Sequence, residues 1–575
     1  MTKTTTSPRA AHWPADTSGP ALWEISLGDL LDQQAAAHPD RLAVIVDEMG
    51  GARSTRWTYA TLKADADLLA RGMIDWGIGA GDRVAVMAPN CREWVLLEYA
   101  LAKIGAVLVT VNPALKPAEL DYLLGQGQVV ALFFAGGFRG VDIADVLRGL
   151  MPDLADVSGG VRAGAQALPA LRRLALMGTG DAPFAVPFDA LMALGDGVDD
   201  AVRIARQAAV NPRDVAQIQY TSGTTGKPKG AMLTHHSTVN NARLMAERGG
   251  YGPDDLMLSA MPLFHTAGCV CNVMAMLACG GGLITMDSFD AARMLELWDE
   301  HRPTLLNAVP TMMVRMLEHP DYPQRNTRTL RRVISGGTSI PPSLMRRMED
   351  ETGGAPLIIM GMTECSPIIT QTRDEDDLDT RLTTAGTPLP HTEIRVVDPE
   401  TGQTCTFGQS GELCIRGYLV MQGYFDMPEK TAEAIDAEGW LHSGDLAVLE
   451  EAGHLRIVGR IKDMIIRGGE NVYPVEIESC LLDHPGVSQA QVVGVPDADL
   501  GEESFAYVVL IEGEQATPQA LQEFCRERMA RHKMPKYVSI VSEMPMTANG
   551  KIQKFALRND AIAAIQDGRI RPVRG

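Results

Sequence analysis

The 575-residue sequence has few aromatic residues, few cysteines and fewer basic than acidic side chains. Aromatic residues make up 5% of the chain, and 52 Lys and Arg against 72 Asp and Glu give a formal net charge of −20. Few stacking platforms and an acidic surface exclude nucleic acid as an expected partner. Nine cysteines in so long a chain do not make a disulfide framework, so we expect a reduced, cytoplasmic protein.

Long apolar runs are also missing. No uninterrupted run approaches the roughly 20 residues of a membrane span, so we expect no membrane span. Residues 1–20 are rich in Thr, Ser, Ala and Pro and lack the apolar core of a secretory signal, which predicts a disordered tail. Cys269, Cys271 and Cys279 lie in an apolar stretch with no His at finger spacing, which favours buried packing over a metal cluster.

What the sequence does contain is an alternation of short apolar runs with helical patterns. The runs at 41–46, Arg83–Met87 and Val107–Val111 predict buried strands, and Arg92–Ile104 predicts a helix between two of them. This alternation is typical of parallel α/β sheets with helices on their faces. The Gly- and Ala-rich segment at about 135–180 predicts little regular structure.

The pattern changes toward the C-terminus. Beyond about residue 385, short strands between Gly and Pro turns, such as 412–416, predict a β-rich subdomain that ends near 460. After it, helices at 473–482 and 518–529 and strands at 490–495 and 505–511 predict a separate α+β unit. Because the chain exceeds the size of one hydrophobic core, we expect a large N-terminal domain at 21–460 and a smaller C-terminal domain at 461–575.

The strongest chemical signal is the segment 220–230, Tyr-Thr-Ser-Gly-Thr-Thr-Gly-Lys-Pro-Lys-Gly. Glycines let backbone N–H groups wrap an oxyanion, hydroxyls donate to phosphate oxygens and lysines neutralise charge. A flexible polar hairpin is the alternative. The segment is not the P-loop of mononucleotide kinases, because Pro228 follows Lys227 and residues 230–234 predict a strand instead of a helix. It predicts a phosphate loop between two strands.

Further motifs follow in a fixed order, at 360–364, 441–445, 459–478 and 545–551. With the phosphate loop, they resemble the adenylate-forming superfamily of acyl- and aryl-CoA synthetases, firefly luciferases and peptide-synthetase adenylation domains, most of all its medium-chain fatty-acyl-CoA synthetases. The resemblance runs from about Trp57 to Lys551. It implies an α/β fold in which a large N-terminal domain of two parallel-type sheets and a small β-rich subdomain carries a smaller, mobile α+β C-terminal domain.

The resemblance also implies roles for single residues, with ATP, Mg²⁺ and coenzyme A as cofactors. It makes Thr363 a contact of the α-phosphate and Glu364 the Mg²⁺ ligand, although Thr363-Glu364 alone could be a helix cap. The nucleotide-binding residues that it implies are Thr221, Ser222, Gly223, Thr224, Thr225, Gly226, Lys227, Lys229, Gly337, Met360, Gly361, Asp445 and Arg460.

Two departures from the family pattern accompany these motifs. Met360 stands where most relatives have an aromatic residue beside adenine, and a thioether can still pack on a base. Leu441-His442-Ser443 replaces the usual Tyr-Arg-Thr before the ribose carboxylate of Asp445, a change that we expect to be neutral. In isolation, Asp445 and Arg460 would be residues of solvated turns.

By the same resemblance, Lys462 is the hinge of the C-terminal domain, and Gly468 and Gly469 contact the pantetheine arm of CoA. A plain Gly-rich turn is the alternative for the two glycines. Lys551 is implied as the catalytic lysine that bridges the substrate carboxylate and the α-phosphate, where an isolated loop lysine would otherwise indicate only a solvated surface.

The predicted activity is that of an AMP-forming carboxylate–CoA ligase for a small-molecule acid, with a medium-chain fatty acid favoured. The segments 261–268, 307–311 and 335–338 are expected to line the acyl pocket, and the substrate residues implied are His265, Val309, Gly336 and Met362. His265 could equally be a packed core histidine. An aromatic or alicyclic acid, a carrier-protein-loading enzyme, a luciferase-like oxidase and a silent adenylate sensor stay open. The short segment after Lys551 favours free CoA over a fused carrier, and a homodimer stays open.

Overall fold

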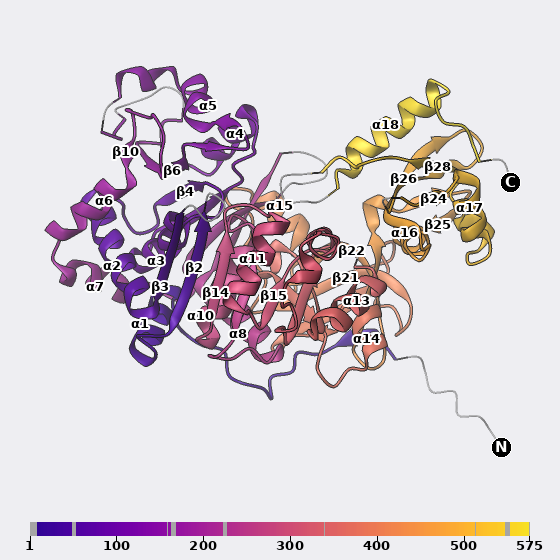
Figure 1. The fold of residues 1–575 in the computed structure, drawn as a ribbon, viewed down its shortest axis with the longest axis horizontal. Coiled ribbons are helices and arrows are strands. Elements are labelled where there is room, and N and C mark those ends of the chain that lie inside the picture. Colours follow the sequence, from indigo (N-terminus) through magenta and orange to yellow (C-terminus); the bar gives the residue numbers. More distant parts are fainter. Residues whose placement is uncertain are drawn as a thin grey trace.

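The computed structural model describes residues 9–48, 53–157, 159–162, 168–221, 227–338, 340–511, 513–546 and 552–573. Four main sheets organise them, and Figure 1 shows the chain passing from an N-terminal α/β region at one side of the molecule to a C-terminal unit at the other. This arrangement confirms the predicted α/β class. No helix among the described residues is both long and apolar enough to cross a membrane.

The first large sheet has seven strands and is parallel except at one edge. Its order is β10 (Val186–Pro187), β9 (Arg173–Met177), β6 (Ala131–Ala135), β4 (Arg83–Met87), β5 (Val107–Val111), β11 (Val215–Thr221) and β12 (Lys229–Thr234), with β12 antiparallel to β11. The helices of this region are α2 (Tyr59–Asp75), α3 (Arg92–Ile104), α4 (Pro117–Gln126), α5 (Ile143–Leu150), α6 (Phe188–Leu194) and α7 (Asp200–Ala208). The predicted strands at 83–87 and 107–111 and the helix between them are confirmed.

The second large sheet has nine strands. Its order is β19 (Thr387–Pro388), β18 (Ile368–Gln371), β17 (Ala355–Gly361), β16 (Arg332–Gly336), β15 (Leu305–Asn307), β13 (Leu256–Ser259), β14 (Gly282–Met286), β2 (Leu42–Glu48) and β3 (Arg53–Thr58). The six strands from β17 to β2 are parallel, and the outer strands are antiparallel. The predicted strand at 41–46 is confirmed as β2.

Helices cover both large sheets. The main apolar core joins residues of both sheets through α1 (Leu27–Ala37), α2, α3, α8 (His235–Arg248) and α10 (Ala275–Cys279). Separate clusters lie under α4 and α5 and under α11 (Ala291–His301), α12 (Pro310–Leu317) and α13 (Pro342–Thr352). Burial on both faces explains why these parallel strands are continuously apolar. Cys269 and Cys271 are buried in the main core and Cys279 packs against it, which supports packing over a metal cluster.

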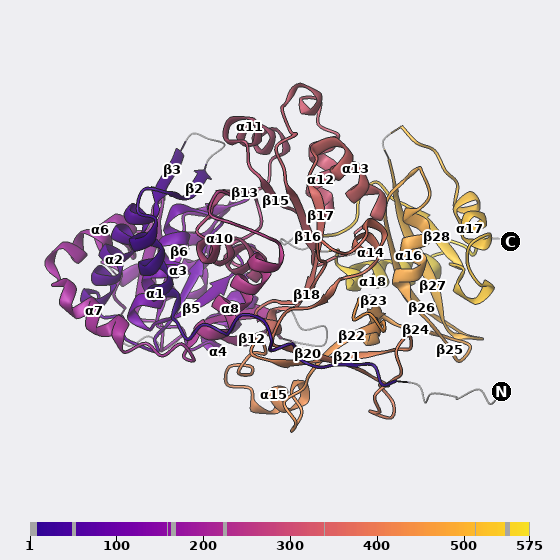
Figure 2. The same ribbon diagram turned by 90° about the horizontal axis from the view of Figure 1, so that it is seen from below.

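The third sheet is antiparallel and confirms the predicted β-rich region. Its order is β1 (His12–Trp13), β20 (Thr392–Val397), β21 (Ser410–Gly417), β22 (Leu441–Leu449) and β23 (Leu455–Arg460), with α15 (Pro428–Ala434) beside it (Figure 2). The presence of β1 corrects the predicted tail. His12 pairs with Arg395 and Ala11 is fully buried, because an edge strand of the sheet can pair with any extended segment whatever its composition.

The C-terminal sheet is built from β24 (Ile465–Arg467), β25 (Glu470–Val472), β26 (Val487–Asp497), β27 (Gly501–Leu510) and β28 (Tyr537–Ile540). It carries α16 (Pro474–Leu482), α17 (Pro518–Arg526) and α18 (Lys554–Gln566), and Figure 2 shows this unit at one side of the molecule. Both predicted helices and both predicted strands of this unit are confirmed, with boundaries shifted by a few residues.

The prediction for 135–180 is wrong in part. The segment contains α5 and the strand β9, which pairs with β6 and β10 inside the seven-stranded sheet. The helix carries Ile143, Val146, Leu147 and Leu150 at helical spacing, and these side chains pack against the neighbouring core, so the prediction overlooked a local signal in a Gly- and Ala-rich segment.

Candidate active site

The strands β11 and β12 flank the predicted phosphate loop in the sequence, and they pair with each other. Thr221 and Lys229 face each other as the last cross-strand pair, and the Thr221 hydroxyl lies 3.5 Å from the Lys229 carbonyl oxygen. The ammonium of Lys227 lies 4.8 Å from the centre of the Tyr122 ring. The expectation of a strand on each side of the segment is therefore confirmed. The other predicted loop residues, Ser222, Gly223, Thr224, Thr225 and Gly226, lie outside the described part of the chain.

Glu364 is brought to the loop end of the β11–β12 strand pair by β17 and the short helix η6 (Thr363–Cys365). A Cβ at Gly361 would lie 2.1 Å from the Pro367 carbonyl oxygen, so this turn requires glycine. The buried Glu364 carboxylate accepts a hydrogen bond from Tyr424 Oη at 2.9 Å and a longer one from Thr221 Oγ1 at 3.4 Å, both at Oε1. Residues from three separate parts of the sequence thus converge on one carboxylate.

Tyr424 is a residue that sequence reasoning missed. Burial raises the pKa of its phenol, and the Glu364 carboxylate raises this pKa further. The phenol therefore stays protonated and donates a hydrogen bond to Glu364. On the other side, the Lys229 ammonium lies 4.1 Å from the centre of the Tyr424 ring. One buried ring therefore contacts both a carboxylate and a cation of the candidate site. The signal in the sequence was weak: a tyrosine after Gly423 in a chain with few aromatics.

The ribose-motif carboxylate and its predicted partner lie side by side. Asp445 of β22 and Arg460 of β23 are cross-strand partners, and Arg460 Nε lies 2.7 Å from Asp445 Oδ1. The Asp445 carboxylate is buried, whereas about half of the Arg460 side chain is exposed. The backbone N–H of Asp445 donates to Ser443 Oγ at 3.0 Å, and this hydroxyl donates to the Leu413 carbonyl. The sheet thus presents one charged pair at a defined position.

The ribose pair and the Glu364 cluster lie near one another. Burial raises the pKa of the Cys365 thiol, and the carboxylates of Glu364 and Asp445 raise it further. The predicted hinge residue is close as well. Burial lowers the pKa of Lys462, while Asp445 and Asp463 act in the opposite direction. Lys462 lies in η7 (Ile461–Asp463), the short turn between the β-rich sheet and the C-terminal sheet.

Gly468 and Gly469 form the two-residue turn of the β24–β25 hairpin in the C-terminal sheet. Their φ angles of 59° and 84° are both positive, as in the type I′ turns that glycine favours. Lys551 lies outside the described residues. The loop that contains it is closed at its base by a bridge between Met546 and Ile552 and by a hydrogen bond from Gln553 N–H to Pro545 O at 2.8 Å.

The three segments expected around the acyl group follow β13, β15 and β16, which are adjacent parallel strands. Their carboxyl ends meet at one sheet edge, which is where open α/β sheets place ligands. A buried network supports this edge: Asn307 donates to Asn272 at 2.6 Å, Asn272 donates to Ser259 at 3.0 Å, and Ser259 donates to the Asn307 carbonyl at 2.7 Å.

The single residues predicted for this edge occupy different positions. Val309 caps α12, and His265 Nδ1 accepts from the Ala267 N–H at 3.1 Å as the N-cap of the short helix α9 (Thr266–Gly268). A Cβ at Gly336 would lie 2.3 Å from a carbonyl oxygen of β17, and Gly337 has a φ of 76°. Two partly buried residues of the magnesium motif, Met360 and Met362, pack against the core of the β-rich sheet.

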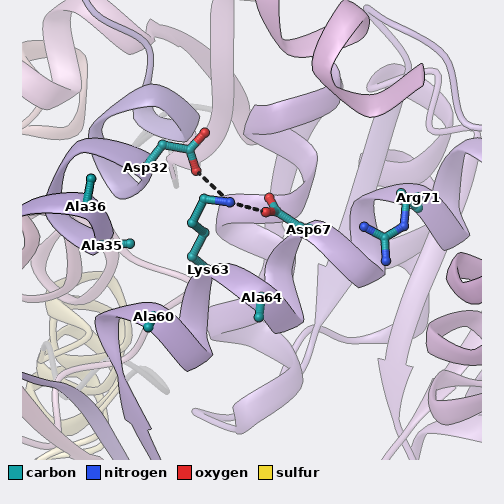
Figure 3. Close-up of a pocket in the computed structure, with 8 residues that line it drawn as sticks. All are labelled: Asp32, Ala35, Ala36, Ala60, Lys63, Ala64, Asp67 and Arg71. Carbon is teal, nitrogen blue, oxygen red and sulfur yellow. Dashed lines mark hydrogen bonds and ion pairs between the residues drawn. The ribbon is translucent and has the colours of Figure 1, made fainter. Parts of the chain in front are cut away.

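A cavity of about 450 Å³ lies elsewhere, between α1 and α2 (Figure 3). Its cationic Lys63 contacts Asp67 and lies 3.8 Å from Asp32, and Arg71 bonds Asp200 at 3.0 Å. Since these charges are paired within the protein and no phosphate-loop residue lines the cavity, we do not place the active site there.

Comparisons with known proteins found matches along most of the chain. The profile described as AMP-binding enzyme matches residues 31–425, and that described as AMP-binding enzyme C-terminal domain matches 476–551. The chain is 42% identical to YngI of Bacillus subtilis, over 93% of this chain and 97% of that protein. It is 37% identical to the mitochondrial medium-chain acyl-CoA ligase ACSF2 of Homo sapiens, over 93% and 87%. The crystal structure of the anthranilate CoA ligase AuaEII with anthranoyl-AMP matches with a TM-score of 0.83. The two chains are 25% identical, over 96% of this chain and 99% of that one.

Proposed function

The chain belongs to the AMP-binding enzyme family, and we propose that it is an AMP-forming acid–CoA ligase. It activates a carboxylic acid with ATP and transfers the acyl group to coenzyme A. Relatives that match along almost the whole chain are named as acyl-CoA ligases, and one related structure contains an acyl-adenylate. The observation that carries the proposal is the convergence of Thr221, Lys229 and Glu364 around Tyr424, next to the Asp445–Arg460 pair.

The Glu364 carboxylate fits the Mg²⁺ that we propose for this site. Both hydrogen bonds to it end on Oε1, and no hydrogen bond from the described residues engages Oε2. A carboxylate oxygen is the ligand that Mg²⁺ prefers beside phosphate oxygens. When bound, the ion neutralises charge on the phosphates during the displacement. Tyr424 and Thr221 hold the carboxylate in place for it.

In the first step, the substrate carboxylate attacks the α-phosphorus of ATP, and the bond to pyrophosphate breaks. Both reactants are anions, so the protein must supply positive charge and fixed positions. Lys229 and the loop at 221–229 bind the pyrophosphate oxygens, and Thr363 contacts the α-phosphate. Asp445 accepts from the ribose hydroxyls, with Arg460 beside it. Lys551 bridges the acid and the α-phosphate.

In the second step, the CoA thiol attacks the acyl carbon and AMP leaves. We propose that residues 461–575 rotate about Lys462 for this step, withdrawing Lys551 and bringing Gly468-Gly469 to the pantetheine arm. The position of η7 between two sheets and the separate family matches at 31–425 and 476–551 support a division at this point. Glycines at the turn leave backbone without side chains to approach a ligand closely.

A medium-chain aliphatic acid is the substrate that we propose. The human relative ACSF2 is named for this chain length, and the pocket segments 261–268, 307–311 and 335–338 contain no Lys or Arg that would pair with a second carboxylate. Each buried methylene contributes about 0.8 kcal/mol, so kcat/KM should rise severalfold per carbon until the pocket is full. An aromatic acid is the second candidate, because the related AuaEII is an anthranilate ligase.

Acid-dependent pyrophosphate release, measured with and without CoA over linear acids of increasing length and over aryl acids, tests these proposals. We expect release with linear acids of intermediate length and thioester formation only when CoA is present. No acid-dependent release from folded protein would refute adenylation. Pyrophosphate release without thioester formation on CoA, but with acylation of a carrier protein, would make the carrier protein the acyl acceptor in place of CoA. An aryl acid with a kcat/KM ten times that of every linear acid would make aromatic acids the substrate class in place of aliphatic ones.

A further inference from the structure

Three side chains with metal-binding atoms lie on one face of the β21–β22 pair. Glu412 and Cys414 are two residues apart on β21, and His442 is the direct cross-strand partner of Cys414 on β22. His442 Nδ1 lies 2.8 Å from Glu412 Oε2 and 3.5 Å from Cys414 Sγ. Alternation along a strand places residues i and i+2 on the same face, so the sheet itself groups the three atoms.

The donor atoms and their spacing fit Zn²⁺. Thiolate, imidazole and carboxylate are its usual ligands, and Zn–S and Zn–N bonds of about 2.3 and 2.0 Å at a tetrahedral angle separate S and N by roughly 3.5 Å. The Cys414–His442 distance already has this value, and the Glu412–His442 distance must widen by about half an ångström. Cys414 is fully buried, whereas about a third of the His442 side chain is exposed, so an ion can enter from the His442 side.

The surroundings of the three residues match a divalent ion. Asp436 Oδ2 lies 3.6 Å from His442 Nε2, the nitrogen that a metal on Nδ1 leaves for an outer carboxylate. Asp436 is itself held by the backbone N–H groups of Glu438 and Trp440 at 2.9 Å. Once the thiol has lost its proton, Glu412, Asp436 and Cys414 carry three negative charges. The guanidinium of Arg395, which contacts Asp436 at 3.3 Å and also lies beside Cys414, offsets one of them.

From this geometry we propose that Glu412, Cys414 and His442 form a binding site for Zn²⁺, with the fourth position open to water. The Cys414 thiol releases its proton to the buffer as the S–Zn bond forms, because only the thiolate binds the metal.

The site is connected to the ribose motif. Glu412 Oε1 accepts the backbone N–H of Gly444 at 3.1 Å, and Gly444 directly precedes Asp445. Gly444 has a φ of 70°, a conformation that glycine adopts readily, and the hydrogen bond to Glu412 helps to position this turn. Zn²⁺ on Oε2 moves the Glu412 carboxylate and with it the turn that presents Asp445. Occupation of the site therefore weakens ATP binding; this consequence rests on the proposed function, whereas Zn²⁺ binding does not. We expected His442 to be a neutral replacement in the ribose motif, and the proposal instead makes it a ligand of Zn²⁺.

Binding is measured on chelator-treated, nucleotide-free protein by competition with a chromophoric zinc chelator and by Co²⁺ titration. We expect one site that shows a thiolate-to-Co²⁺ charge-transfer band. Cys414→Ser should abolish the band, and Cys414→Ser and His442→Gln should each lower Zn²⁺ affinity at least tenfold. Cys405→Ser is the matched control in the connection between β20 and β21, where the Cys405 thiol donates to the Ser410 carbonyl. Cys91→Ser controls for the buried Cys91, which lies beside Glu48 and Glu93.

Zn²⁺ affinity that is unchanged in both variants, or a missing charge-transfer band in the parent, overturns the proposal. Should Cys414→Ser fail to fold, His442→Gln, a change at a partly exposed side chain, decides alone. For the coupling, Zn²⁺ should raise the KM for MgATP severalfold in the parent and much less in His442→Gln. Equal inhibition of both proteins would assign the effect to another site and overturn the coupling. Absent acid-dependent pyrophosphate release from folded, Zn²⁺-free protein supplied with MgATP would instead refute the proposed function and leave the binding result standing.

Discussion

Replacing Tyr424 by Phe tests the arrangement around Glu364 most directly. The change removes the hydroxyl that donates to Glu364 at 2.9 Å and keeps the ring that lies 4.1 Å from the Lys229 ammonium. The only other side-chain hydrogen bond to this carboxylate among the described residues is the 3.4 Å contact from Thr221. Hydrogen bonds to charged groups contribute about 1.5–3 kcal/mol, and loss of an outer partner of a metal ligand costs about 10–100-fold in metal affinity.

We therefore expect Tyr424→Phe to raise the half-saturating Mg²⁺ concentration by about 10–100-fold. The assay is pyrophosphate release against free Mg²⁺ at fixed ATP, together with calorimetric binding of a non-hydrolysable ATP analogue with and without Mg²⁺. The kcat at saturating Mg²⁺ should change less, because Tyr424 acts through Glu364 and touches no reacting atom.

Tyr424→Leu is the matched variant, since it removes both the hydroxyl and the ring. It should additionally weaken nucleotide binding by about 0.5–2 kcal/mol through the lost cation–π contact with Lys229. Circular dichroism and thermal unfolding establish that both variants are folded. An unchanged Mg²⁺ curve in folded Tyr424→Phe would refute the reasoning, because Glu364 would then need no support from Tyr424.

Lys551→Ala should slow adenylation by roughly 10²–10³-fold and largely spare CoA attack on supplied acyl-adenylate; equal loss in both half-reactions would make Lys551 structural. Lys462→Pro, which restricts φ at the hinge, should leave pyrophosphate release measurable while thioester formation collapses, and normal thioester output would remove the hinge. Burial, and then the neighbouring Glu93, raises the pKa of Glu48 from its ordinary value of 4.5 to about 7. The folded protein therefore keeps a proton that the unfolded chain releases near pH 4.5, so the free energy of unfolding falls as the pH rises between these two values. Glu48→Gln should consequently melt higher than the parent at pH 8 and near the parent at pH 4, and a lower melting temperature at pH 8 would contradict this sign.

Local pattern was enough to determine much of the fold. The strands at 83–87 and 107–111 and the helix at 92–104 have the predicted bounds, because each carries its apolar residues at its own period. The phosphate loop was also readable, since its glycines, hydroxyls and lysines are adjacent in the chain. Motif order and spacing predicted the family, and the comparisons confirm it.

The strand β1 could not be predicted from local pattern. β1 spans only two residues and exists because the edge of the β-rich sheet offers it partners. Its stabilising contacts come from elsewhere in the chain, and periodicity does not contain them. The helix α5 differs, because Ile143, Val146, Leu147 and Leu150 recur at helical spacing; this local signal was overlooked in a Gly- and Ala-rich segment.

The sequence by itself determined which residues could bind phosphate, ribose and metal, because residue chemistry is a local property. Only the tertiary structure decided how they meet. Tyr424 follows Glu364 by 60 positions and Thr221 precedes it by 143, yet all three share one carboxylate. The pairing of Cys414 with His442 likewise depends on the register of β21 and β22. A one-residue slip would turn these side chains to opposite faces, and that register is set by packing across the whole sheet.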